Sequence, residues 1–169
     1  MSASTGTVAE LFERAIALER AAEALYEQLE KMFARHLEVA LFWKHYADEE
    51  NGHALYLERV HEGVGEGRLI QPADEDILRK VHYCLEQASP ARLTKVKTLE
   101  DAYQLAHELE NSETNAIFEF IVLNFSTDEL AKSHAFLRTQ LNTHIARLDN
   151  DFPNPYKSKA ARQSLFAWQ

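Results

Sequence analysis

The chain has 169 residues, of which 46% are hydrophobic and 27% charged, a composition typical of one globular domain with a single core. Its net charge of −9 argues against a nucleic-acid partner and against docking on an anionic membrane, because both need a basic face. A single cysteine, Cys84, excludes an internal disulfide and any Cys-x-x-Cys metal motif. No apolar run is long enough to span a bilayer and no secretory leader is recognisable, so we expect a cytoplasmic protein.

Apolar residues recur every three or four positions in four long stretches, which is the period of a helix with one buried face. We therefore expect long helices over residues 7–33, 36–62, 98–125 and 126–150. Between the second and the third, Asp74 or Asp76 is expected to cap a shorter helix that ends near Gln87. Thr98 is the predicted N-cap of the third long helix, with Asp101 at the capping-box position.

Two short turns and one long crossover connect these helices. Scarce glycine (5) and proline (4) also argue against a fold with many tight turns. We therefore predict an all-α fold in which residues 1–150 form a ferritin-like antiparallel four-helix bundle, with the short extra helix in the crossover between helices 2 and 3. Residues 151–169 are expected to be a tail that packs on the bundle or on a partner subunit, because they include Leu165, Phe166 and Trp168.

Each long helix carries an ionisable side chain midway along its core-facing apolar stripe. These candidate metal ligands are Glu19 in the first helix, Glu50 and His53 in the second, Glu110 and Glu113 in the third, and His144 in the fourth. An unpaired carboxylate in a core costs several kcal/mol, so their coincidence at mid-helix needs a common cause. His144 is also open to a second interpretation, as a core histidine bonded to a helix carbonyl.

The spacing of these residues supplies that cause. From Glu19 to His53 (53 − 19) and from Glu110 to His144 (144 − 110) the separation is 34 residues, so the two helix pairs form an internal repeat. Glu19 and Glu50 are also equidistant from the predicted turn near residue 34, which places them at one height in an antiparallel hairpin. All four helices thus bring their polar groups to one level.

Carboxylates and imidazoles at one level of a bundle are suited to metal binding. Glu50 and His53 stand at i and i+3, one helical turn apart on the same face. A carboxylate can bridge two ions while the imidazole terminates one of them. Mixed oxygen and nitrogen ligation suits iron or manganese, and zinc is also accepted.

The motifs resemble the rubrerythrin branch of the ferritin-like superfamily. The resemblance is carried by AIALE at 15–19 with Tyr26, by ADEENGH at 47–53, and by LAHELE at 105–110 continuing to Glu113. It implies a di-iron centre that reduces peroxide or activates dioxygen. Because the chain encodes no second redox centre, we expect electrons from an external donor protein, and the tail at residues 151–169 favours a homodimer. In that family's pattern Glu50 and Glu110 are bridging ligands, while the terminal ligands are Glu19, Glu113, His53 and His144.

The chain departs from the family in two places. It lacks the four cysteines of a rubredoxin-like module, and Leu141 stands where the fourth helix should carry a glutamate three residues before His144. An alternative function is therefore a catalytically degenerate metal-binding or interaction protein with a mononuclear or incomplete site. A hydroxylase acting on an organic substrate is a third possibility, and it requires a pocket beside the metals.

Overall fold

The computed structural model describes residues 6–112, 114–126 and 134–152, and helices account for most of these residues. The helices are α1 (Val8–Met32), α2 (Leu37–Glu62), α3 (Glu66–Leu69), α4 (Glu75–Gln87), the 3-10 helix η1 (Pro90–Lys95), α5 (Leu99–Glu110), α6 (Thr114–Phe125) and α8 (His134–Asp151). Within the described ranges there is no strand, only one isolated bridge between Thr7 and Pro72. The predicted all-α class is confirmed.

Local capping signals set where several helices begin. The side chain of Asp74 accepts a hydrogen bond from the backbone N–H of Ile77 and so caps α4. At the start of α5, Thr98 and Asp101 form the reciprocal capping box that the sequence predicts. These bonds satisfy backbone donors that the first turn of a helix leaves unpaired.

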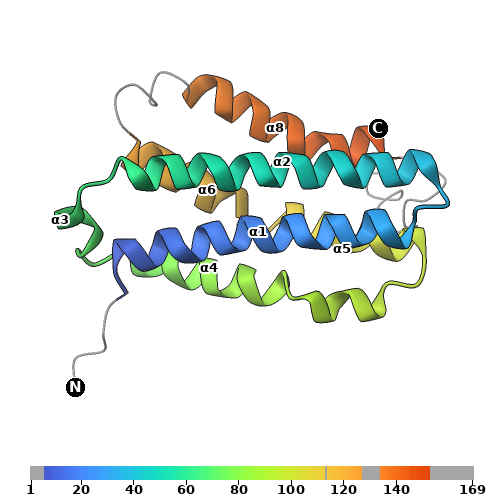
Figure 1. The fold of residues 1–169 in the computed structure, drawn as a ribbon, viewed down its shortest axis with the longest axis horizontal. Coiled ribbons are helices and arrows are strands. Elements are labelled where there is room, and N and C mark those ends of the chain that lie inside the picture. Colours follow the sequence, from blue (N-terminus) through green and yellow to red (C-terminus); the bar gives the residue numbers. More distant parts are fainter. Residues whose placement is uncertain (1–5, 113, 127–133, 153–169) are drawn as a thin grey trace, which may run out of the picture.

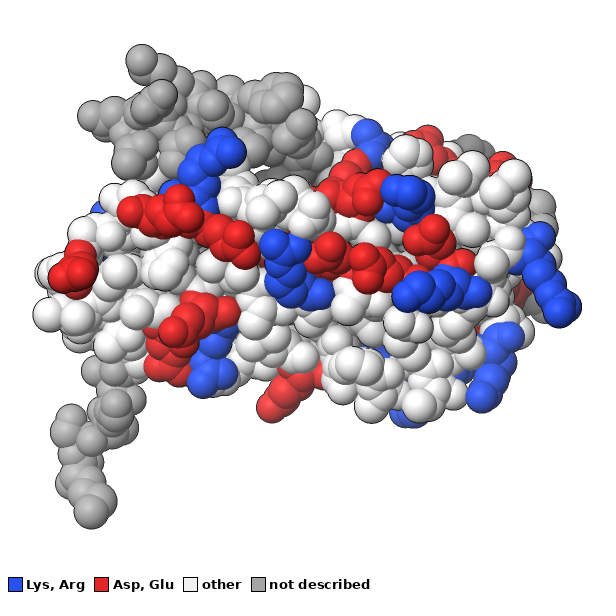
Figure 2. Space-filling model, viewed as in Figure 1, with Lys and Arg blue, Asp and Glu red and all other residues white. Residues whose placement is uncertain are grey.

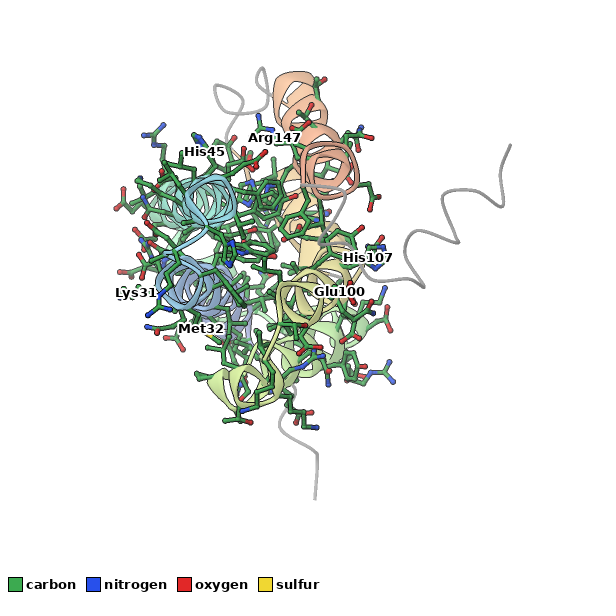
Figure 3. The ribbon with its side chains drawn as sticks, turned by 90° about the vertical axis from the view of Figure 1, so that its right-hand side faces the viewer. Lys31, Met32, His45, Glu100, His107 and Arg147 are labelled. Atoms are coloured by element: carbon green, nitrogen blue, oxygen red, sulfur yellow. The ribbon has the colours of Figure 1, made fainter. Side chains whose placement is uncertain are left out.

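The long helices lie roughly along one axis (Figure 1). α1 and α2 pack side by side over their whole length as an antiparallel pair, and α4 lies against α1. α6 contacts α2, and α8 contacts both α5 and α6. Seen end-on, α1 and α2 form one side of the molecule and α5, α6 and α8 the other, with side chains filling the space between them (Figure 3).

The core is rich in large aromatic side chains at the end where α1 turns into α2. Trp43 is fully buried and stacks on Tyr26, with ring centroids 5.7 Å apart and an angle of 5° between the planes. Phe152, which follows the last residue of α8, also packs on Trp43, with ring centroids 5.4 Å apart. The rest of the predicted tail, residues 153–169, lies outside the described residues.

The third long stretch is divided into α5 and α6, so the prediction of one continuous helix over 98–125 is wrong. The division follows Glu110, at two residues whose side chains bond to carbonyls of the preceding turn. Asn111 Nδ2 donates to the His107 oxygen at 2.8 Å, and Ser112 Oγ donates to the Leu109 oxygen at 2.5 Å. Short polar side chains compete in this way with the backbone hydrogen bonds that continue a helix.

The exterior carries mixed charge. Asp and Glu alternate with Lys and Arg along the face that α1 and α2 present in Figure 2, and Arg20, for example, pairs with Glu23 at 2.8 Å. None of the described helices combines the length and apolar character needed to cross a membrane. The predicted start of the fourth helix at residues 126–128 falls largely outside the described ranges, while its end agrees with that of α8.

Candidate metal centre

The structure brings five of the six candidate ligands together in the core. They come from four helices: Glu19 from α1, Glu50 and His53 from α2, Glu110 from α5, and His144 from α8. The exposed fractions are only 2% for Glu19, 3% for Glu50, 6% for Glu110 and 2% for His144. Glu113, the sixth candidate, lies outside the described residues.

The five side chains form two groups that share one carboxylate. Glu19, Glu50 and His53 make the first group, and Glu50, Glu110 and His144 make the second. In each group, one potential ligand atom per residue lies within 4.8 Å of the others. Each group therefore offers two carboxylates and one imidazole to a metal ion.

Glu50 directs its two carboxylate oxygens to different groups. Its Oε2 lies 3.2 Å from Nδ1 of His53, and its Oε1 lies 3.0 Å from Nε2 of His144. Glu110, which the resemblance implies as a second bridge, contacts only the second group, with Oε2 2.9 Å from the same Nε2. This arrangement gives Glu50 alone, among the described carboxylates, the disposition of a bridging ligand.

Each group contains one buried polar atom that the protein leaves unsatisfied. Glu19 Oε2 is 3.6 Å from His53 Nδ1 and accepts no hydrogen bond. His144 Nε2 is close to two carboxylate oxygens, but these contacts lack the geometry of a hydrogen bond. Buried polar atoms are rarely left unpaired, and a metal ion in each group would satisfy both atoms. The donor set therefore fits two metal ions.

Outside the two groups, Glu49 orients the ring of His144. Glu49 bonds to His144 Nδ1 with one carboxylate oxygen and to Arg147 with the other. The exposed fraction of the Glu49 side chain is 28% and that of Arg147 is 40%, and Figure 3 shows Arg147 on α8 near α2. A carboxylate on one ring nitrogen fixes the other nitrogen as the ligand atom, as is usual for metal-binding histidines. Neither Glu49 nor Arg147 was predicted from the sequence as part of the site.

Two tyrosines bond to the same set of residues. The hydroxyl of Tyr26 donates to Glu110 Oε1, which leaves Oε2 facing His144. The hydroxyl of Tyr46 donates to the backbone carbonyl of His144 at 2.6 Å. Burial, followed by the nearby charge of Glu110, raises the pKa of Tyr26 well above its usual value, so this hydroxyl keeps its proton. Both tyrosines thus hold a candidate ligand or its backbone in place.

Burial changes the proton affinities of the cluster. Burial and the neighbouring Glu50 carboxylate raise the pKa of Glu19 to about 8. For His53, burial lowers the pKa, but the carboxylates of Glu19 and Glu50 outweigh it and raise the value to about 10. At neutral pH both groups therefore hold protons, which a metal ion has to displace.

We accordingly expect metal affinity to increase with pH between 6 and 8. Because the pKa of Glu19 is raised to about 8, its proton is bound at pH 6 and progressively lost as the pH approaches 8. Zinc affinity should change about tenfold per pH unit for each displaced proton. Calorimetric zinc titrations at pH 7, in two buffers that differ in ionisation enthalpy, would count the protons released. An affinity that stays constant from pH 6 to pH 8 would contradict this account of the cluster.

A cavity of about 360 Å³ opens beside the two histidines, between α2, α6 and α8. Its lining includes the rings of His53 and His144, so it reaches both groups. Thr139 and Thr143 on α8 are exposed and form part of its rim. Small molecules that enter this cavity reach the rings of both histidines.

Comparisons of the chain with family models, with curated proteins and with solved structures found no match. The resemblance to rubrerythrins therefore remains an expectation based on the motifs at 15–19, 47–53 and 105–110. What the cluster does has to be inferred from its donor atoms, its burial and its cavity.

Proposed function

We propose that the chain is a di-metal carboxylate protein of rubrerythrin type. It binds two metal ions, for which iron is the favoured candidate, and it reduces peroxide or activates dioxygen. The observation that carries this proposal is the pair of buried groups that share Glu50, each with two carboxylates and one histidine. Zinc or manganese would also suit these donors. Bound iron would supply the redox chemistry and polarise an oxygen substrate.

In this proposal, the side chains provide ligands for two metal ions. Glu50 would be shared by both ions, Glu19 and His53 would hold one of them, and Glu110 and His144 would hold the other. Glu49 and Tyr26 hold the ligands of the second position in orientation. The fold assignment belongs to the same proposal: α1, α2, α5 with α6, and α8 are the helices of a ferritin-like bundle, and α4 is its crossover helix.

The charge of the cluster favours an oxygen substrate. Among the described ligands, the carboxylates of Glu19, Glu50 and Glu110 would carry −3 in total once metal has displaced the proton of Glu19, whereas two divalent ions carry +4. The remaining charge of +1 attracts an anionic or easily polarised oxygen ligand in a buried site. Peroxide and dioxygen are small enough to enter through the cavity. Electrons would come from an external donor protein, and we propose a homodimer located in the cytoplasm.

Leu141 supports a second candidate function. It stands where the resemblance expects a glutamate, one helical turn before His144, and its side chain lies outside those that the structure describes. With that carboxylate missing, the second position has fewer ligands. The alternative is therefore a metal-binding or interaction protein that holds one ion and has no catalytic activity.

Metal content and peroxide turnover test the proposal together. After anaerobic loading with ferrous iron and removal of excess metal, elemental analysis should give about two irons per chain. The reduced, loaded protein should then consume hydrogen peroxide faster than the same concentration of free iron. One ion or none would favour the alternative. Two ions without accelerated peroxide consumption would retain the metal centre and overturn the proposed activity.

A further inference from the structure

The cavity beside the histidines is larger than the proposed oxygen substrates require. Its volume is about 360 Å³, whereas an apolar cavity of about 150 Å³ is enough to hold benzene. The additional space is bounded by residues that include His53 and His144. A molecule of one or two rings could therefore lie directly beside the candidate metal positions.

Gly52 keeps part of this space open. It lies in the middle of α2 and lines the cavity, although glycine inside a helix is less stable than alanine. Its backbone does not need glycine, since no described glycine has a positive φ. Packing does not need it either, because an added Cβ would meet no atom within 4 Å. The absence of a side chain here serves the cavity rather than the fold.

One wall of the cavity is aromatic, formed by Tyr56 and Phe118. The ring of Phe118 lies 4.9 Å from that of His53 and 6.0 Å from that of Tyr56. A wall of this kind offers stacking surface to a ring.

The charged residues of the lining are already paired. Arg147 and Glu49 bond to each other, and Glu49 also bonds to His144. The wall therefore presents no unpaired charge from Arg147 or Glu49, which favours an uncharged ligand over an anion or a cation. The two histidines lie on the same lining, where a polar end of the ligand would face the ions.

We propose that this cavity binds a small neutral aromatic molecule with a hydroxyl group at one end, and that Gly52 limits its size. The ring lies against Phe118 and Tyr56, and the hydroxyl faces His53 and His144. The orientation of the hydroxyl rests on the proposed metal centre, whereas binding of the ring does not.

Binding of phenol and 2-naphthol, measured by calorimetry on metal-free and zinc-loaded protein, tests this proposal. Both probes should bind saturably, at one site per chain, to wild-type protein. The Gly52→Leu variant should weaken 2-naphthol binding at least ~10-fold because its side chain fills the cavity. Gly52→Ala should weaken 2-naphthol more than phenol while raising the melting temperature. Gly67→Leu is the matched control, because a Cβ at Gly67 also meets no atom within 4 Å, and it should leave binding unchanged.

Two outcomes would overturn the proposal. The first is the absence of saturable binding to wild-type protein, and the second is an unchanged 2-naphthol affinity in both Gly52 variants. Zinc content is measured on the same samples to separate this test from that of the metal centre. If the protein binds the probes but takes up no zinc on loading, the metal centre is refuted and the cavity is retained. Two zinc ions per chain without probe binding would retain the metal centre and refute the proposed ligand site.

Discussion

Glu50→Gln is expected to prevent stable binding of both metal ions. The substitution keeps the size of the side chain but removes the only described carboxylate that belongs to both groups. Burial opposes the charge of Glu50, yet the close contacts with His144 and His53 hold its pKa well below the usual range, so the wild-type group is ionised. Loss of a partner outside the ligand shell typically weakens metal binding ~10–100-fold, and loss of the shared ligand should weaken it more. Iron or zinc content should fall from about two ions per chain to fewer than one.

Glu58→Gln is the matched control for this experiment. Glu58 lies on the same helix, eight residues further on, and its side chain is 43% exposed and paired with Arg20. This variant should bind as much metal as wild-type protein. If Glu50→Gln also retains two ions of unchanged affinity, Glu50 is not the bridging ligand and the proposed centre is wrong.

Trp43→Ala is expected to lower the free energy of unfolding by about 3–5 kcal/mol, because it leaves a large cavity in a packed core. Trp43 is fully buried between Tyr26 and Phe152. For a chain of this size the melting temperature should fall by roughly 10 °C. Urea unfolding of the metal-free protein, followed by circular dichroism, measures the change without a contribution from bound ions.

Trp43→Phe separates lost packing from lost polar contacts. The indole Nε1 of Trp43 is buried and has no hydrogen-bond partner, so replacing it by phenylalanine removes an unsatisfied donor as well as some volume. The loss of stability should be less than half of that in Trp43→Ala. A Trp43→Ala protein that unfolds at the wild-type urea concentration would show that this aromatic cluster does not hold α2 and the end of α8 together.

The ligand cluster was predictable because burial leaves a periodic trace in the sequence. Glu19, Glu50 and Glu110 each occupy a place on an apolar stripe that would normally hold a hydrophobic residue, and their spacing aligns them at one height. Glu49 and Arg147 could not be recognised in this way, because both are partly exposed and lie beside the apolar stripes of their helices. An Asp-Glu-Glu run at residues 48–50 was the only local hint, and such runs are common on solvated helices.

The helix boundaries were likewise predicted only in part. The cap at Asp74 and the capping box at Thr98 were predicted because a few neighbouring residues determine them. The division at Asn111 and Ser112 was missed because Glu110 and Ile117, seven residues apart, keep the helical period across it. Periodicity records which face is buried, and it does not record side chains that donate hydrogen bonds to backbone carbonyls and so compete with the helix.

The two ligand groups differ in how much of the chain must fold before each exists. Glu19, Glu50 and His53 all belong to the α1–α2 hairpin, whereas the second group also needs α5 and α8. The first group can therefore assemble from contacts that are close in sequence, and the second only after the two halves of the chain have associated. An ion at the proposed second position would join those halves directly, so its release would have to precede their separation. Metal would then slow unfolding chiefly through the second position, even where the first position binds more tightly.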